Sequence, residues 1–374
     1  MADLTEFKMD YNYLGRTGLQ VSNLCLGTMT FGQSSFHGGL PGQCDEELSH
    51  QILNRYVELG GNFIDTADIY SLGNSESIIG NWLKQQQRDE YILATKVFFW
   101  RVNPDINRQG LTRRHIVKSI EESLERLQTD YVDLYQMHCW DNATPIRETL
   151  LTFNDLIRCG KIRHAGCSNV TGWQLQQIVD LNRELGLNPF ISLQQQYSLA
   201  TRHDEFESFN VCKLNGIAVL PWSALKGGAL SGKYKREERP VAGRIGWVAQ
   251  DEAQRGNQTF PSWDKLEGSD KIWNTIGKLE EISKSKGKSV AQVAIRWLLQ
   301  RDVVSSVIIG VRNLKQLNDN AVASSGWKLT REEMKELNEV SMPDIPYPYE
   351  QIWRQNDYKN NKYLPSYFVD DVTN

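Results

Sequence analysis

The 374-residue sequence predicts an α/β fold, a (β/α)8 TIM barrel that forms one domain. Short apolar runs alternate with amphipathic helical patterns along most of the chain, and this alternation is typical of a parallel sheet. Eight such units are enough to close the sheet into a barrel. The predicted strands are 24–26, 63–65, 92–95, 132–137, 164–167, 191–194, 218–221 and 307–309.

Helical periodicity and capping sequences support the predicted helices. Apolar residues at 116, 117, 120, 124 and 127 predict a helix over 112–127 with one apolar stripe. Three later helices are predicted to begin with a capping box, in which Ser or Thr is followed three residues later by Gln or Glu. These boxes are Thr171 with Gln174, Ser289 with Gln292 and Thr330 with Glu333.

The domain is predicted to span 1–374, with its core at about 11–340 and a β-hairpin over 13–21 that closes the bottom of the barrel. Three segments exceed what a barrel needs: a lengthened first βα loop over 32–45, a long loop over 234–270 after the seventh predicted strand, and an aromatic C-terminal tail over 341–374. Long loops at the C-terminal face of a barrel usually carry function. The tail either does the same or packs over the barrel wall.

Composition narrows the function classes. The net charge of −4 comes without a basic stripe, which argues against nucleic acid as the main partner. The start of the chain has no signal-peptide pattern, and no apolar run is long enough to span a bilayer, so we expect a cytoplasmic protein without a membrane partner. We also expect a monomer or weak oligomer.

The cysteines predict reduced thiols and no metal site. All six are scattered, and none forms a CxxC motif. Cys159, His164 and Cys167 lie close in sequence, but their spacing fits no zinc module, and a fourth ligand is not apparent.

Three consecutive predicted strands end in side chains that carry charge or protons. Asp65 ends the second strand, Tyr70 follows five residues later, Lys96 ends the third run, and His138 ends the fourth. Because parallel strands of a barrel open onto one face at their C-terminal ends, these four side chains should converge in one pocket. Taken singly, the aspartate could cap a helix, the lysine could be a solvated charge, and the histidine could be a core residue. Their order favours a catalytic site.

The sequence around these residues resembles the catalytic tetrad of the aldo-keto reductases. The matching stretches are Asn62-Phe63-Ile64-Asp65-Thr66-Ala67-Asp68-Ile69-Tyr70, Ala94-Thr95-Lys96 and Gln136-Met137-His138. The resemblance runs from Tyr13 to about Asn320 and is closest to bacterial sugar-type members and to potassium-channel β-subunits. It implies an NADPH-dependent oxidoreductase that reduces an aldehyde or ketone to the alcohol.

The chemistry of the four residues fits this reaction. Hydride delivery to a carbonyl leaves an alkoxide, which must be protonated as it forms. A free phenol has a pKa of about 10, so we expect the Lys96 ammonium to lower the pKa of Tyr70, the general acid. Asp65 should keep Lys96 charged and oriented, and His138 should polarise the carbonyl. Asp68 is expected to be a local loop or cap residue.

A nicotinamide cofactor is expected to bind without a Rossmann motif, because no GxGxxG follows the first predicted strand. The glycine-rich stretch 227–233 resembles a P-loop, but Tyr234 stands where a magnesium-binding Ser or Thr is required, which excludes ATP. The resemblance implies cofactor contacts from Thr28, Met29, Asp65, Ser168, Asn169, Gln194, Trp222, Ser223, Leu225, Gly227, Lys233, Gly310, Arg312, Gln316 and Asn320. A guanidinium pairs bidentately with phosphate, so Arg312 favours NADPH over NADH. The alternative for Arg312 is a surface ion pair with Asp319.

The expected substrate contacts are Phe31, Trp100, Arg101 and Trp140. Aromatic walls suit sugars or aryl aldehydes, and Arg101 or Arg202 could hold a carboxylate or phosphate. The predicted substrate is therefore a sugar-derived and optionally anionic carbonyl, although solvent exposure explains both arginines equally well.

Two other functions compete. The first is a non-catalytic NADP-binding regulatory subunit, but the histidine is commonly replaced in those proteins and His138 is present here. The second is a lyase that forms a Schiff base on Lys96. A Schiff-base lysine must be neutral, whereas Asp65 is expected to keep Lys96 protonated.

Overall fold

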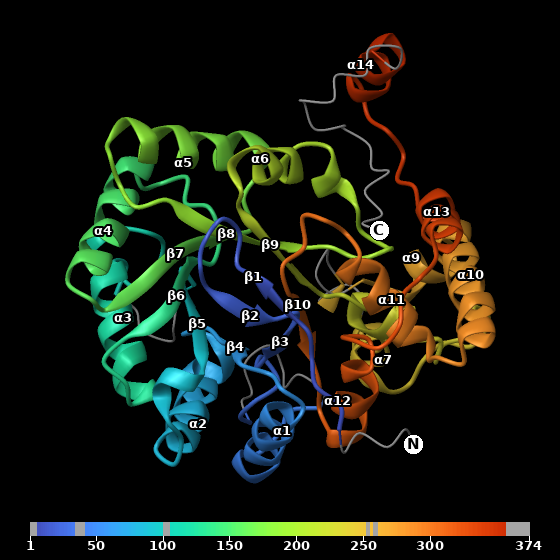
Figure 1. Cartoon of the computed structure of the whole chain (residues 1–374), viewed down its shortest axis with the longest axis horizontal. Helices are drawn as coiled ribbons and strands as arrows, with labels where there is room; N and C mark the ends of the chain where they lie inside the picture. The colour runs from blue at the N-terminus through green and yellow to red at the C-terminus, as the bar shows by residue number, and fades with distance from the viewer. Residues whose placement is uncertain (1–5, 34–41, 100–104, 252–254, 257–260, 357–374) are drawn as a thin grey trace.

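The computed structural model describes residues 6–33, 42–99, 105–251, 255–256 and 261–356. Within them, eight parallel strands form a barrel wall in the order β10, β3, β4, β5, β6, β7, β8, β9 (Figure 1). The strands are β3 Leu24–Gly27, β4 Phe63–Asp65, β5 Ile92–Val97, β6 Val132–Met137, β7 Ile162–Ser168, β8 Phe190–Gln196, β9 Ala218–Trp222 and β10 Val307–Gly310. The predicted barrel is confirmed, and every predicted strand lies inside an observed one.

The two edges of this sheet meet through the segment just before β10. The backbone N–H of Val219 in β9 donates to the carbonyl of Val303 at 3.1 Å, and its carbonyl accepts from Ser305 at 3.0 Å. The sheet thus closes on itself, and the C-terminal ends of its strands open onto one face.

Helices follow the strands as the alternation predicts. Strands β3 to β8 are followed by α1 Glu46–Glu58, α2 Asn74–Leu83, α3 Arg113–Leu127, α4 Ile146–Arg158, α5 Gly172–Glu184 and α6 Ser208–Asn215. Helices α10 Asp270–Lys286 and α11 Val290–Leu299 precede β10, and α12 Leu314–Ala321 and α13 Arg331–Val340 follow it. All three predicted capping boxes are present.

The predicted helix over 112–127 is α3, capped by the Thr112 side chain, which accepts from the His115 N–H. Its buried apolar stripe contains Ile116, Ile120, Leu124 and Leu127. Val117 was predicted to share this stripe. It directly follows the buried Ile116 and is 36% exposed, so it lies outside the stripe.

The predicted hairpin over 13–21 is formed by β1 Tyr11–Tyr13 and β2 Gln20–Ser22. Its pairing begins two residues earlier and ends one residue later than expected, with Tyr11 opposite Ser22. Figure 1 shows the hairpin lying across the barrel. Leu14 and Val21 are fully buried and pack with the residues inside the barrel, including Phe63 and Leu134. The hairpin therefore closes the barrel at the N-terminal ends of its strands.

The segment over 234–270 is partly helical. It contains α7 Gly243–Ala249 and α9 Trp263–Glu267. Ile245, Trp263 and Leu266 pack with Ala229 into a small apolar cluster separate from the main core. Residues 252–254 and 257–260 lie outside the described residues.

The C-terminal tail begins with α14 Tyr349–Asn356, which Figure 1 shows projecting beyond the barrel wall. The Trp353 ring stacks on Phe206 at 5.8 Å, and the Tyr349 hydroxyl donates to Glu207 at 2.5 Å. The start of the tail therefore packs on the segment between β8 and α6. The remaining tail aromatics, from Tyr358 to Phe368, lie outside the described residues.

Candidate active site

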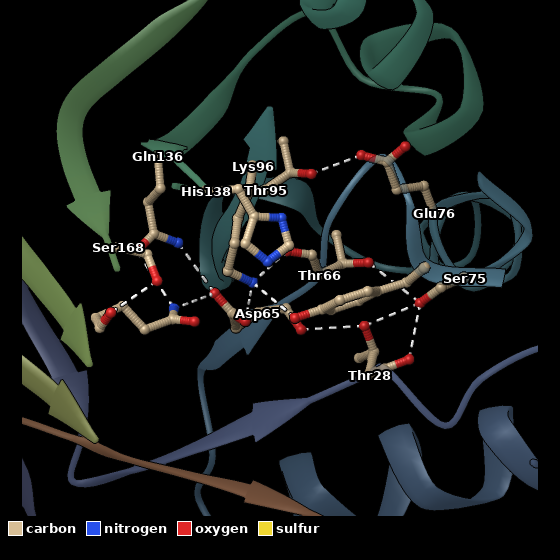
Figure 2. Close-up of polar contacts among 12 residues, drawn as sticks. Thr28, Asp65, Thr66, Ser75, Glu76, Thr95, Lys96, Gln136, His138 and Ser168 are labelled. Carbon is tan, nitrogen blue, oxygen red and sulfur yellow. Dashed lines mark hydrogen bonds and ion pairs between the residues drawn. The ribbon is translucent and has the colours of Figure 1, made fainter. Parts of the chain in front are cut away.

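The four predicted catalytic residues meet at the C-terminal face of the barrel. Asp65 is the last residue of β4, Lys96 lies in β5, and His138 directly follows β6. Tyr70 begins the short 3-10 turn η2 Tyr70–Gly73, between β4 and α2. Figure 2 shows Asp65, Lys96 and His138 pointing toward one another.

The Lys96 ammonium is fully buried and is the centre of the cluster. It donates to Asp65 Oδ1 at 2.5 Å, to the Thr66 carbonyl at 2.7 Å and to the Tyr70 hydroxyl at 3.2 Å. An ammonium has three N–H groups, so each has an acceptor. Because the Tyr70 oxygen accepts from Lys96, its own O–H remains available to donate to a substrate.

His138 completes the group from the other side. Its ring meets the Tyr70 ring edge-on at 5.9 Å and the Phe99 ring at 4.7 Å. Its Nδ1 is buried and has no hydrogen-bond partner among the described residues. Burial, with a smaller contribution from Lys96, lowers the pKa of His138 well below the usual value of 6.5. The ring is therefore neutral at pH 7 and can donate one N–H.

The pKa of Tyr70 differs from the sequence-based expectation. Burial raises it above the usual value of 10.0, and the Lys96 ammonium lowers it by less. The predicted contribution of Lys96 has the right sign, but the predicted net lowering is wrong because burial outweighs it. Burial lowers the pKa of Lys96, yet Asp65 and Tyr70 outweigh burial and leave that pKa above 10.5. The lysine stays charged, which disfavours the Schiff-base alternative.

Two amides hold the second oxygen of Asp65. Oδ2 accepts from Gln136 Nε2 at 3.0 Å and from Gln194 Nε2 at 2.9 Å. Gln136 belongs to the stretch Gln136-Met137-His138 that resembles the family, but it was not among the predicted site residues. The available signal was its place in β6 two residues before His138, because residues two apart in a strand face the same side.

The carboxylate also fixes how the Gln194 amide is turned. An ionised carboxylate only accepts hydrogen bonds, so the amide nitrogen must face it. Nε2 of Gln194 lies within 3.3 Å of Gln136 Oε1 as well, which occupies its second N–H. The Oε1 atom remains an acceptor, as binding the N–H of a nicotinamide carboxamide requires.

Other predicted cofactor residues gather around the same face. Ser168 ends β7 and donates from its hydroxyl to the Gln194 carbonyl at 2.7 Å, and Asn169 donates to the His138 carbonyl at 2.8 Å. Trp222 ends β9, where Ser223 and Leu225 lead into η5 Lys226–Ser231, which contains Gly227. Met29 follows β3 and is partly exposed. Thr28 is fully buried, and its hydroxyl donates to the Asp65 carbonyl at 3.0 Å. Its side chain therefore holds the backbone of Asp65 in place.

Cationic side chains gather near the end of β10. Arg312 is half-buried, and its positive charge repels those of Lys233 and Arg244. Partial burial and Arg312 lower the pKa of Lys233. The lysine folds back over η5, where a Cβ on Gly228 (φ 99°) would lie 3.0 Å from Lys233 Nζ. Such a group of positive charges fits a phosphate-bearing ligand.

The alternative ion pair of Arg312 is not present among the described residues. Asp319 accepts instead from Ser289 at 2.9 Å and from Gln292 at 2.9 Å. The Gln316 side chain accepts from the Arg312 backbone N–H at 3.1 Å, which holds the loop between β10 and α12. Gly310 is exposed at the end of β10, and Asn320 is buried in α12.

Predicted substrate residues are only partly brought together. Trp140 is half-buried and meets Trp173, a residue missed from the sequence, at 5.8 Å. Phe31 is fully buried in the main core, so its side chain does not face a substrate as predicted. Trp100 and Arg101 lie outside the described residues.

The suggested anion-binding role of Arg202 is wrong. Arg202 is buried and forms two bonds with Glu205, at 2.7 Å and 2.9 Å, and a third with the Asn338 carbonyl at 2.7 Å. It joins the segment after β8 to α13. Its charge is neutralised inside the protein.

Asp68 is also buried, two residues before Tyr70, and its backbone N–H donates to the Lys96 carbonyl at 3.3 Å.

Among the described residues, no group of three His, Cys, Asp or Glu side chains is arranged to hold a metal ion. No helix in the described part of the chain is long and apolar enough to cross a membrane.

Comparison with known proteins shows the family of the chain. The model of the aldo/keto reductase family matches residues 23–342. The chain is 36% identical to the uncharacterized oxidoreductase YrpG of Bacillus subtilis, over 89% of this chain and 96% of that protein. It is 34% identical to versiconal hemiacetal acetate reductase of Aspergillus parasiticus (91% and 100%) and 30% identical to norsolorinic acid reductase of Aspergillus flavus (88% and 80%). The chain is an oxidoreductase of carbonyl compounds and belongs to the aldo/keto reductase family.

Proposed function

We propose that this protein reduces an aldehyde or ketone with NADPH and that Tyr70 is the general acid. The observation that carries the proposal is the contact between Lys96 Nζ and the Tyr70 hydroxyl, 3.2 Å long, with Asp65 on the same ammonium. It leaves the tyrosine proton free for the substrate oxygen.

The residues divide the work as follows. The carbonyl oxygen binds between the Tyr70 hydroxyl and the neutral His138 ring, which donates an N–H and polarises the carbonyl. A bound nicotinamide cofactor supplies the hydride to the carbonyl carbon. As negative charge develops on the oxygen, Tyr70 gives up its proton and the alcohol forms. Lys96 then stabilises the phenolate.

The raised pKa of Tyr70 is compatible with this role. A general acid must hold its proton at working pH, and burial ensures that. The Lys96 ammonium lowers the cost of the phenolate that remains after transfer. The pair therefore combines a stored proton with a stabilised product of proton transfer.

Three positive side chains favour NADPH over NADH. The charge of Arg312 acts on both Lys233 and Arg244, so the three cations lie near one another. The family resemblance puts Lys233 at the pyrophosphate of the cofactor and Arg312 at its adenosine end. NADPH carries an additional phosphate there, and guanidinium groups bind phosphate in a bidentate manner.

We also propose a ring-bearing carbonyl as substrate, of the sugar-derived or aryl kind. Phe99 contacts the His138 ring and supplies flat apolar surface there, and Trp140, two residues after His138, meets the exposed Trp173. Two relatives are named for reducing versiconal hemiacetal acetate and norsolorinic acid. A preference for an anionic sugar carbonyl rests on Arg101 alone.

The experiment is a turnover assay with purified protein. NADPH consumption is followed with paired aldehydes, one set ring-bearing and one set short and aliphatic. Turnover that is faster with the ring-bearing set and faster with NADPH than with NADH supports the proposal. Tight NADPH binding without turnover of any carbonyl would favour a regulatory nucleotide-binding protein instead.

A further inference from the structure

The turn that follows Tyr70 has a strained backbone. Ser71 (φ 47°), Leu72 (φ 58°) and Gly73 (φ 95°) follow one another in the left-handed region. Glycine adopts this conformation at little cost, whereas Ser and Leu do not. Strain of this kind persists only where surrounding contacts hold it, and it is concentrated at functional sites.

The Ser71 hydroxyl ties the turn to the loop after β3. Its Oγ lies 2.7 Å from the Phe31 carbonyl and 3.1 Å from the Gly32 carbonyl, so one O–H is shared between two acceptors. Both carbonyls belong to the loop after β3. The serine thus joins the tyrosine turn to a different part of the chain, about 40 positions earlier.

The loop at the other end of this contact is itself anchored. The Phe31 N–H donates to the Thr28 carbonyl at 2.9 Å, and the Gly32 N–H donates to the Cys44 carbonyl at 2.8 Å. The Thr30 hydroxyl donates to the Val311 carbonyl at 2.8 Å. Because Val311 directly follows β10, the acceptors of Ser71 are fixed to the barrel wall.

Gly32 makes the close approach possible. It has φ 86°, and a Cβ at this position would lie 3.0 Å from the Ser71 Cβ and 2.8 Å from Asn74 Nδ2. A larger residue would push the tyrosine turn away from the loop.

We infer that Ser71 is a positioning residue that sets the distance between the Tyr70 hydroxyl and the Lys96 ammonium. This inference rests on the proposed role of Tyr70. The Tyr70–Lys96 bond is 3.2 Å long, at the upper end of the range for N–H···O bonds, so a small displacement of the turn breaks it. Ser71 acts on the reaction through Tyr70 and does not touch the substrate.

Ser71→Ala removes the two bonds and keeps the strained position. We expect kcat to fall roughly tenfold to a hundredfold with little change in KM, because misplaced catalytic groups cost rate more than binding. We also expect the basic limb of the pH profile of kcat to move to higher pH. The Lys96 ammonium lowers the pKa of Tyr70, so a longer distance between the two groups raises that pKa. Ser77→Ala is the matched control. Its hydroxyl donates to the Gly73 carbonyl at 3.3 Å and does not join the turn to the loop after β3, so we expect unchanged kcat.

Ser71→Gly separates the hydroxyl from the strain. Ser71→Gly removes both the hydroxyl and the strain. If strain alone mattered, Ser71→Gly would be slow and Ser71→Ala would be normal. We expect both variants to be slow, and Ser71→Gly at least as slow as Ser71→Ala. Wild-type kcat and pH profile in both variants, with or without a lower Tm, would overturn the inference. Tyr70→Phe in the same assay tests the proposed function separately. If that variant is inactive while both Ser71 variants are normal, only this inference fails; if it is active, the role of Tyr70 fails.

Discussion

The side-chain nitrogen of Gln136 lies 3.0 Å from Asp65 Oδ2, inside the barrel and out of contact with solvent. Asp65 is charged, buried and bound to Lys96 through its other oxygen. Each donor on such a carboxylate replaces water that burial has removed. Gln136 is therefore part of what allows an ion pair to exist at the centre of this protein.

Gln136→Leu should destabilise the fold, because it leaves an oxygen of the buried carboxylate with one amide donor in place of two. A hydrogen bond to a charged group contributes roughly 1.5–3 kcal/mol, which is the loss we expect in the free energy of unfolding. The measurement is urea unfolding at pH 7. Gln177→Leu at an exposed position of α5 is the control, with an expected change within about 0.5 kcal/mol. Equal losses in the two variants would mean that the amide does not support Asp65.

Arg312→Ala should weaken NADPH far more than NADH. The lost charge-assisted bond to phosphate is worth roughly 1.5–3 kcal/mol. Titration of both cofactors by quenching of tryptophan fluorescence measures the two losses, with Arg331→Ala at an exposed position of α13 as the control. Equal weakening of NADPH and NADH would show that Arg312 does not touch the additional phosphate.

The segment over 234–270 should close over bound NADPH. The charges of Arg244 in α7 and of Arg312 repel each other, and Tyr70 also acts on Arg244, so this residue of the segment lies near the site. Lys235 and Arg239 are exposed and offer trypsin cleavage sites. We expect NADPH to slow cleavage at these sites and ATP to leave it unchanged. Cleavage at the same rate with and without NADPH would contradict closure.

Arg101→Ala should reduce the preference for an anionic substrate. We expect a sugar aldehyde that carries a carboxylate or phosphate to exceed its neutral counterpart in kcat/KM. If Arg101 binds the substrate equally in the ground state and the transition state, the variant should lose this advantage mainly through KM. A preference for neutral aldehydes, together with an Arg101→Ala variant that behaves as wild type, would retire the idea.

Sequence predicted the convergence of three of the four catalytic residues because it follows from strand order alone. Asp65, Lys96 and His138 each lie at or beside a strand end, and a barrel brings those ends together without any knowledge of packing. Tyr70 could be placed only because the matching motif includes it, since its position depends on the unusual turn at Ser71 and Leu72.

Burial is where sequence reasoning failed. Arg202 has an acidic partner three residues away, yet only the structure shows that the pair is inside the protein. Phe31 is one residue from a partly exposed loop position and is nevertheless core. The net rise in the pKa of Tyr70 has the same origin, because the extent of desolvation depends on neighbours that are distant in sequence. Gln136 and Asp65 are 71 residues apart, and no local pattern links them.

The most direct test of the account is the turnover of Tyr70→Phe with bound NADPH. The variant loses the proton donor and keeps the ring, so NADPH affinity should stay at the wild-type value. We expect kcat to fall by roughly 10²–10⁴, the usual contribution of a general acid. Near wild-type turnover with normal NADPH binding would contradict the assignment of Tyr70 and with it the proposed mechanism.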